Sequence, residues 1–298
     1  MSDVLLTSTP PSAAAYPLHD LLIIDNLHLH GEMNTSSETV TEHIAASIRR
    51  GHAQLWPQGL QTQRVALLGG GPSLNATFPD LVELLRNDTK LVTTNGAYQW
   101  ALERHLVPSA QIVMDARETN ARFVDPALPK CQYLLASQCH PTLWDRVEGR
   151  PFVWLWHALG KEGPQADLLT RYYGEDRWTP IGGGSTVIMR GLVLLRMLGF
   201  TRVDVFGCDS CWLDGQHHAY DQAENAKEQR IHIQARPDGR DDLTRDFWCA
   251  PWHLAQVSDF LHFVKAKTEM HVTVHGDGLL AHVVNTCAEI NVVSVEGA

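Results

Sequence analysis

Residues 64–75 read RVALLGGGPSLN, an apolar run of strand-forming residues that ends at three glycines before a proline and a serine. Glycine lets the backbone approach a bound anion closely, and proline suits the first turn of a helix. A helix N-terminus adds unpaired N–H donors and partial positive charge. The pattern predicts a strand–turn–helix unit that either binds a phosphate or is simply a tight turn. The candidate binding residues are Gly69, Gly70, Gly71, Pro72 and Ser73.

Apolar runs with strand character recur along the chain. They lie at 64–69, 90–94, 110–114, 132–136, 152–156 and 202–206, and segments with helical spacing lie between several of them, at 79–86, 96–105 and 186–198. Strands that alternate with helices indicate a mostly parallel sheet covered by helices on both faces. The sequence therefore predicts an α/β, Rossmann-like fold.

Two segments depart from this rhythm. Residues 1–62 are predicted to form an N-terminal extension with one or two helices, and residues 63–298 the Rossmann-like catalytic domain. Residues 213–250 are polar and lack apolar periodicity. A long irregular insertion of this kind is usually a lid or binding loop, so an irregular lid is predicted there.

Bulk composition excludes several classes of function. The net charge is −10 and the chain has no basic stripe, which argues against nucleic-acid binding. No apolar run approaches the roughly 20 residues that a membrane span needs, so no span is predicted. Six cysteines are scattered, and the Cys208–Cys211 pair has no second pair to complete a zinc site. We therefore predict no metal site, and reduced thiols in a cytoplasmic protein.

Polar residues follow the predicted strands. In open α/β sheets, ligands bind beyond the carboxyl ends of the strands. Asn95 and Gly96 follow one strand, Asp115 the next, and Asp209 a later one. Asn95 suits a base, a ribose or a phosphate, or else a turn. Asp115 and Asp209 are candidates to orient a substrate or a divalent cation, or to cap the following helix.

A second glycine turn, IGGGST at 181–186, leads into the clearest helical segment, 186–198. It offers helix-terminal donors and two hydroxyls, with Gly184, Ser185 and Thr186 as candidate binding residues. Ser185 is placed to cap the helix. We expect the two turns to face one cleft, although close packing of the helix on the sheet would also explain the glycines.

Three ring side chains are candidates for proton transfer or phosphate contact. His218 and Tyr220 lie in the predicted lid, and His253 opens a later helix. Imidazole titrates near neutral pH, so a cleft histidine can take a proton from an acceptor hydroxyl.

The motifs in this order resemble the MptE-like family, which includes archaeal 6-hydroxymethylpterin diphosphokinase and bacterial motility accessory factors that glycosylate flagellin. The resemblance covers residues 64–125 and 180–210. It rests on the segments GGGPSL 69–74, TNGA 94–97, LVP 106–108, IVMD 112–115, GGSTV 183–187, LGF 198–200 and VFGCD 205–209.

The same plan is similar to bacterial sialyltransferases that use CMP-sugars. That resemblance implies that residues 69–74 hold the nucleotide and that residues 184–186 contact it. It also implies that Trp212 or Tyr220 faces the phosphate and that His253 is the catalytic base.

Two departures favour one branch of these families. Where the diphosphokinases carry Asp-Gly-Ala and Asp-x-Asp-Gly, this chain has Asn95-Gly-Ala and Asp115-Ala-Arg117. Diphosphoryl transfer needs Mg²⁺, usually held by more than one carboxylate. Cleavage of a sugar–phosphate bond needs only one stabilised phosphate and one base.

The resemblances imply a nucleotide-dependent transferase, and we expect a glycosyltransferase with a CMP-sugar donor and a glycan, protein or small-molecule acceptor. His253 would be the base, His218 or Tyr220 would steady the departing phosphate, and Asp209 would orient the substrate. A divalent cation is optional, and a homo-oligomer is compatible with the sequence. Two alternatives stay open: an ATP-dependent diphosphokinase acting on a pterin-like alcohol, and a nucleotide-binding module without catalysis.

Overall fold

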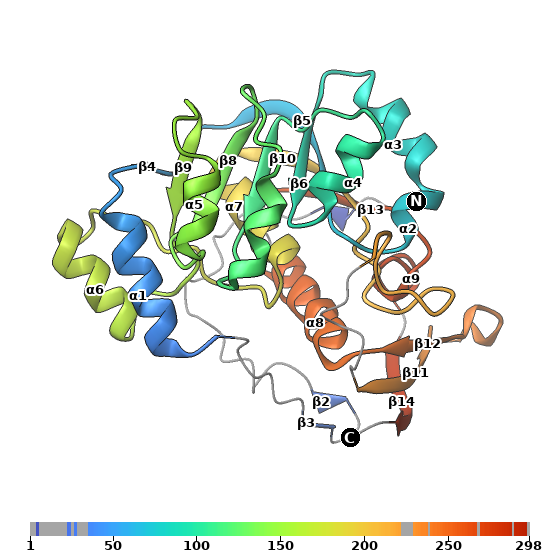
Figure 1. Ribbon diagram of the computed structural model, residues 1–298. Coiled ribbons are helices and arrows are strands. Elements are labelled where there is room, and N and C mark those ends of the chain that lie inside the picture. Colours follow the sequence, from blue (N-terminus) through green and yellow to red (C-terminus); the bar gives the residue numbers. More distant parts are fainter. Residues whose placement is uncertain are drawn as a thin grey trace.

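The centre of the fold is a nine-stranded sheet with the order β1-β13-β10-β5-β6-β7-β8-β9-β4 (Figure 1). The computed structural model describes residues 4–5, 23–24, 27–28, 35–221, 229–237, 239–266, 269–287 and 289–296. β1 pairs with β13 in the antiparallel sense, and the other neighbouring strands are parallel. The predicted α/β, Rossmann-like fold is confirmed.

The strands of the main sheet are β1 Val4–Leu5, β4 Ala53–Gln54, β5 Gln61–Leu68, β6 Thr89–Thr94, β7 Ala110–Val113, β8 Gln132–Ala136, β9 Val153–Trp156, β10 Phe200–Phe206 and β13 His271–Val274. The remaining strands are β2 Ile23–Ile24, β3 Leu27–His28, β11 Arg230–Arg236, β12 Arg245–Cys249 and β14 Glu289–Glu296. The six strands expected between residues 64 and 206 all form, with ends that differ by a few residues.

The helices are α1 Ser37–Ile48, α2 Ser73–Ala76, α3 Phe78–Leu85, α4 Ala97–Glu103, α5 Pro141–Arg146, α6 Pro164–Tyr173, α7 Val187–Met197, α8 Pro251–Lys265 and α9 Leu279–Thr286. Two 3₁₀ segments, Glu118–Val124 and Asp241–Leu243, complete the regular structure.

Helices cover both faces of the sheet, as the alternation along β5 shows. Val65 and Leu67 pack into a large apolar cluster that includes residues of α7 and α8. Ala66 and Leu68 point the other way, into a smaller cluster with residues of α2, α3 and α4. Because successive side chains of a strand face opposite sides, this burial pattern requires a layer of helices on each face.

The strand order reverses at β5. From β5 the chain adds β6, β7, β8 and β9 on one side, and then places β10 and β13 on the other. Ligands of open α/β sheets bind at such a switch point, beyond the carboxyl ends of the strands. The first glycine turn follows β5 and Asp209 follows β10, so both lie there.

The N-terminal segment joins the edge of the main sheet. β4 pairs with β9, and α1 contacts α5 and α6. β5 begins at Gln61, so the domain boundary predicted after residue 62 falls inside this strand.

The segment predicted as an irregular lid is partly regular. β11 and β12 pair with each other, and β11 also pairs with β14, in a three-stranded antiparallel sheet. Ile231, Ile233 and Ala235 are buried and alternate with less buried residues, a strand pattern that the polar partners conceal in the sequence. Residues 222–228 and 238 of this segment lie outside the described residues.

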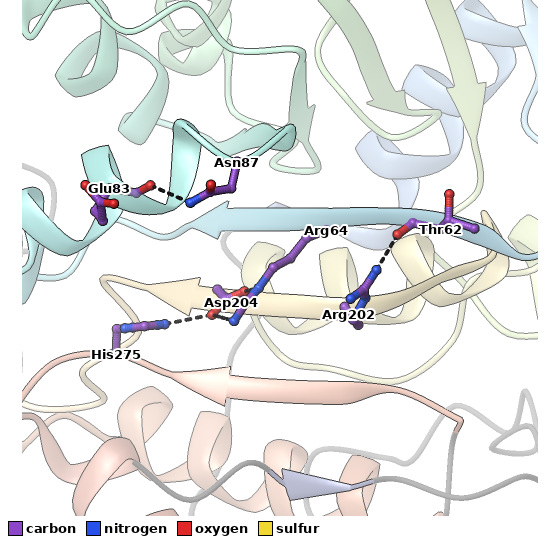
Figure 2. A network of polar contacts seen from close by, with 7 residues as sticks. All are labelled: Thr62, Arg64, Glu83, Asn87, Arg202, Asp204 and His275. Carbon is purple, nitrogen blue, oxygen red and sulfur yellow. Dashed lines mark hydrogen bonds and ion pairs between the residues drawn. The ribbon is translucent and has the colours of Figure 1, made fainter.

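A network of polar side chains links the neighbouring strands β5, β10 and β13 through the buried carboxylate of Asp204 (Figure 2). Asp204 of β10 is 1% exposed, and it accepts hydrogen bonds from Arg64 of β5 and from His275 just after β13. Arg64 Nη2 lies 2.7 Å and His275 Nε2 lies 2.9 Å from Asp204 Oδ1. Burial alone would raise the pKa of Asp204, but hydrogen bonds and charge from His275 and Arg64 hold that pKa below its ordinary value.

Among the residues that the structure describes, no helix is both long and apolar enough to cross a bilayer.

Candidate functional site

The first glycine turn is tied to β10 on its neighbouring side. Gly71 N–H donates to Gly207 O at 2.8 Å, and Ser73 N–H donates to Asp209 Oδ2 at 2.9 Å. A Cβ on Gly71 would collide with that carboxylate, so only glycine fits beside Asp209. The turn therefore donates its helix-terminal N–H to a carboxylate of the protein itself.

Asp209 is a buried carboxylate with few hydrogen-bond donors. It is 3% exposed, and its pKa is raised above the ordinary value because burial disfavours the charged form. Hydrogen bonding from Ser73 opposes this rise, and the charge of Asp277 adds to it. A strongly perturbed acid at a strand end is typical of a functional site.

His218 and Tyr220 lie directly over the turn. Ala219 N–H donates to Gly70 O at 2.9 Å, which anchors the segment that carries both rings. A Cβ on Gly96 would lie 2.6 Å from the Tyr220 ring, and one on Gly70 would lie 2.8 Å from His218 Cδ2. The glycines thus admit two aromatic rings, and burial raises the pKa of Tyr220 well above its usual range.

Four rings continue from Tyr220 into the interior. His218 lies 5.4 Å from Tyr220 and 4.5 Å from His217, measured between ring centroids. Trp212 stacks on His217 at 5.8 Å and meets His253 edge-on at 5.2 Å. The structure therefore brings the three predicted ring residues into one cluster over the first turn.

His253 is the innermost ring of this cluster. It is 2% exposed, and its Nδ1 accepts the Ala250 N–H at 3.0 Å, so the neutral ring carries its proton on Nε2. Burial, followed by the nearby His217 and His218, lowers the pKa of His253 well below its ordinary value. The ring is therefore neutral near pH 7.

The second glycine turn is held by α7 and α8. Arg190 of α7 donates to Ile181 O, and at 3.0 Å to Gly184 O. Asp259 of α8 accepts the Ser185 N–H. The first residue before α7 is Thr186 and not the predicted Ser185, and the Thr186 side chain forms no capping hydrogen bond. The cap prediction was wrong because α7 begins one residue later than the pattern indicated, at Val187.

The two turns are neighbours, and a side-chain link joins the second turn to the segment that follows β10. Gln256 Nε2 donates to Thr186 Oγ1 at 2.8 Å, and Gln256 Oε1 accepts from Ser210 Oγ at 2.8 Å. Ser210 directly follows Asp209, and a Cβ on Gly69 would lie 2.7 Å from Ile188 Cδ1 in the first turn of α7. The two turns therefore lie near each other, and that they face one cleft stays a prediction.

A groove of about 460 Å³ runs between α7 and α8 on the outer side of the second turn. Its lining includes Gly182 to Gly184, Met189, Val193, Asp259 and Phe263, and it includes no residue of the first turn. The second turn thus borders this groove on one side and the switch point on the other.

Asn95 and Asp115 occupy the next two strand ends. Asn95 has a left-handed backbone, φ +44°, and its Oδ1 is buried without a hydrogen-bond partner among the described residues. Asp115 pairs with Arg117, with Nη2 2.6 Å from Oδ2, and it also accepts the Arg117 backbone N–H. Asn95 therefore retains an acceptor for a ligand, whereas the charge of Asp115 is already paired.

Five of the six cysteines are buried, and Cys287 is exposed. Cys208 and Cys211 are buried, and burial raises the pKa of the Cys211 thiol to about 12. Within the described residues, no cluster of three or more His, Cys, Asp or Glu side chains is arranged to hold a metal ion.

Comparison with known proteins supports the motif assignment. The MptE-like family, described as 6-hydroxymethylpterin diphosphokinase MptE-like, matches residues 41–233. This chain belongs to the MptE-like family. The comparison with curated proteins found no match.

A solved structure has a similar fold: the MAf glycosyltransferase from Magnetospirillum magneticum AMB-1, with a TM-score of 0.55 and 9% sequence identity. The similarity covers 88% of this chain and 43% of that one, so this chain spans less than half of that protein. The family description and this structural neighbour both name transferases.

The match to the MptE-like family contains both glycine turns and ends before α8. Sequence reasoning missed Gln256 and Asp259, the α8 residues that hold the second turn, and Arg190 beneath it. One signal was present: His253, Gln256 and Asp259 recur at three-residue spacing on one side of a largely apolar helix.

Proposed function

We propose that this chain is a nucleotide-dependent transferase, and specifically a glycosyltransferase with a CMP-sugar donor. The observation that supports this most strongly is the convergence at the switch point. There, the first glycine turn meets Asp209, His218 and Tyr220, and Ser210, the residue after Asp209, is linked through Gln256 to the Thr186 hydroxyl. Open α/β sheets bind nucleotides at this position.

In the proposed reaction, an acceptor oxygen attacks the anomeric carbon of the sugar, and the bond from that carbon to the phosphate oxygen breaks. Negative charge develops on the departing phosphate. Preorganised donors that face this charge lower the barrier. Tyr220 and His218 lie over the turn that would hold the phosphate, and Asn95 provides an acceptor for a base or ribose.

The acceptor proton needs a nearby base. The sialyltransferase resemblance implies His253, but this ring is 2% exposed and its neutral form carries the proton on Nε2. His218 is half-buried and closer to the turn. We therefore propose that His218 faces the substrate and that His253 supports the ring cluster beneath it.

Substitution distinguishes these roles. If His253 is the base, His253→Ala should lower turnover by about 10²–10⁴-fold with nucleotide affinity retained. If His253 only supports the cluster, its removal should lower turnover by about tenfold or less, and His218→Ala should give the larger loss.

One observation bears on the diphosphokinase alternative. Arg117 neutralises Asp115 at the position where such enzymes need an Mg²⁺ carboxylate, which disfavours Mg²⁺ binding. The experiment compares release of CMP from a CMP-sugar with release of AMP from ATP, each with Mg²⁺ and with EDTA. CMP release that persists in EDTA supports the glycosyltransferase, and Mg²⁺-dependent AMP release supports the diphosphokinase. A thermal shift with nucleotide but no turnover of either donor would favour a binding module.

A further inference from the structure

Gln256 occupies an unusual place between the two glycine turns. It is buried, with 5% of its surface exposed, and both ends of its amide are used. The amide oxygen accepts the Ser210 hydroxyl, and the amide nitrogen donates to Thr186 Oγ1. The family resemblance does not extend to this part of the chain.

Thr186 stands at the position before the first residue of α7, where threonine normally caps a helix. A capping threonine uses its oxygen to accept an N–H of the first turn. Here the side chain forms no such bond, and its oxygen accepts from Gln256 instead. This departure from capping indicates that the hydroxyl has another use.

The direction of the bond from Gln256 decides what the hydroxyl can do. A hydroxyl has one hydrogen to donate and two lone pairs that accept. Since Gln256 donates to Thr186 Oγ1, the Thr186 hydrogen is not used in that contact and points elsewhere. Thr186 is half-buried, so this hydrogen can reach a ligand at the second turn.

We propose that Gln256 is a positioning residue that fixes the Thr186 hydroxyl as a hydrogen-bond donor to the phosphate of a bound nucleotide. This role rests on the proposed nucleotide site. Gln256 is buried and would act on the nucleotide only through Thr186. The link to Ser210, which follows Asp209, sets the amide orientation from the side of the first turn.

The test measures the dissociation constant of CMP by isothermal titration calorimetry. Thr186→Val should weaken CMP binding by about tenfold to a hundredfold, as expected for a hydrogen bond to a charged group. Gln256→Met, which is neutral and close in size, should weaken it by about three- to tenfold. The double variant should bind no more weakly than Thr186→Val, because both changes remove the same interaction.

A matched control is available on α6, where Gln165 Nε2 donates to Thr41 Oγ1 at 3.1 Å, far along the chain from both turns. Gln165→Met removes an equivalent contact and should leave CMP affinity unchanged. Should Gln256→Met not fold, Gln256→Glu serves instead. Its carboxylate would accept the Thr186 hydrogen, so binding should weaken at least as much as in Thr186→Val.

This role would be overturned if the Gln256 variants bound CMP with unchanged affinity. It would also be overturned if the loss of affinity in the double variant equalled the product of the two single losses. Either result would leave the nucleotide site in place. Failure of the unsubstituted protein to bind CMP would overturn both this role and the proposed CMP-sugar function. A fall in melting temperature with unchanged affinity would mark Gln256 as purely structural.

Discussion

Asp204 and Asp209 are both buried, and they lie five residues apart on either side of the end of β10. Asp204 accepts from Arg64 and His275, and its pKa is lowered. Asp209 accepts the Ser73 backbone N–H and forms no ion pair among the described residues, and its pKa is raised. The surroundings of the first aspartate favour its charged form, whereas those of the second disfavour it.

This difference separates a fold-stabilising carboxylate from a functional candidate. A carboxylate that accepts hydrogen bonds from Arg64 of β5 and from His275 just after β13 strengthens the sheet. A carboxylate buried at a strand end with a single backbone donor costs stability, and such costs are characteristic of binding and catalytic sites.

The largest effect should follow from removing the paired carboxylate. Asp204→Ala leaves Arg64 and His275 without their shared partner inside the sheet. The free energy of unfolding should fall by about 3 kcal/mol, at the low end for a buried pair because Arg64 also reaches solvent. Chemical denaturation measures this, and a loss below about 1 kcal/mol would remove the distinction between the two aspartates.

The opposite result is expected for the strand-end carboxylate. Asp209→Asn keeps an oxygen to accept the Ser73 N–H but removes the buried charge. The free energy of unfolding should change by less than about 1 kcal/mol, while transferase turnover falls by about 10²-fold. Paired denaturation and donor-turnover assays check this. Destabilisation as large as that of Asp204→Ala, with turnover intact, would make Asp209 a structural residue.

A substitution at a glycine tests the packing of the strand-end region. Gly96→Ala would push a Cβ to 2.6 Å from the Tyr220 ring, so stability should fall by about 2 kcal/mol. Tyr220→Ala in the same chain should recover most of that loss. Gly191→Ala is the control within the sheet-facing side of α7, where the nearest atom lies at an ordinary 3.4 Å. Equal losses of stability in Gly96→Ala and Gly191→Ala would show that contact with the Tyr220 ring is not the reason that residue 96 must be glycine.

The smallest effect is a difference in pH dependence. Asp204 has a lowered pKa, so its stabilisation is present above the unfolded pKa of about 4 and disappears as pH falls through the folded value. Asp209 has a raised pKa, so its cost is greatest at neutral pH and is relieved as pH falls toward its folded pKa. Between pH 7 and 5, Asp209→Asn should therefore gain less stability than the unsubstituted protein. An identical pH profile for the two proteins would contradict the raised pKa.

The central strands could be predicted from sequence because their signal is local. β5, β6 and β10 are apolar runs with residues buried on both faces of the sheet. One glycine turn follows β5, and the other precedes α7. β11 was missed because only Ile231, Ile233 and Ala235 face the interior, and the polar residues between them conceal the alternation. α6 was missed for a similar reason, since only Ala166 and Leu169 are buried in it.

The sequence indicated candidate site residues, but not the hydrogen bonds that connect them to the rest of the fold. Motifs indicated Asp209, His218, Tyr220 and both turns. Gln256 meets Thr186 across 70 residues of chain, and Asp259 meets Ser185 across 74. Such contacts depend on how α8 lies against α7, which no local pattern in a single sequence encodes.

The most direct test of a nucleotide site at the end of β5 and β10 is a crystal structure of the protein with CMP. The account predicts the phosphate within hydrogen-bonding distance of the residue 69–73 turn and of the Thr186 hydroxyl, with Tyr220 against it. CMP found only in the groove between α7 and α8, with the first turn still donating to Asp209 alone, would contradict the account.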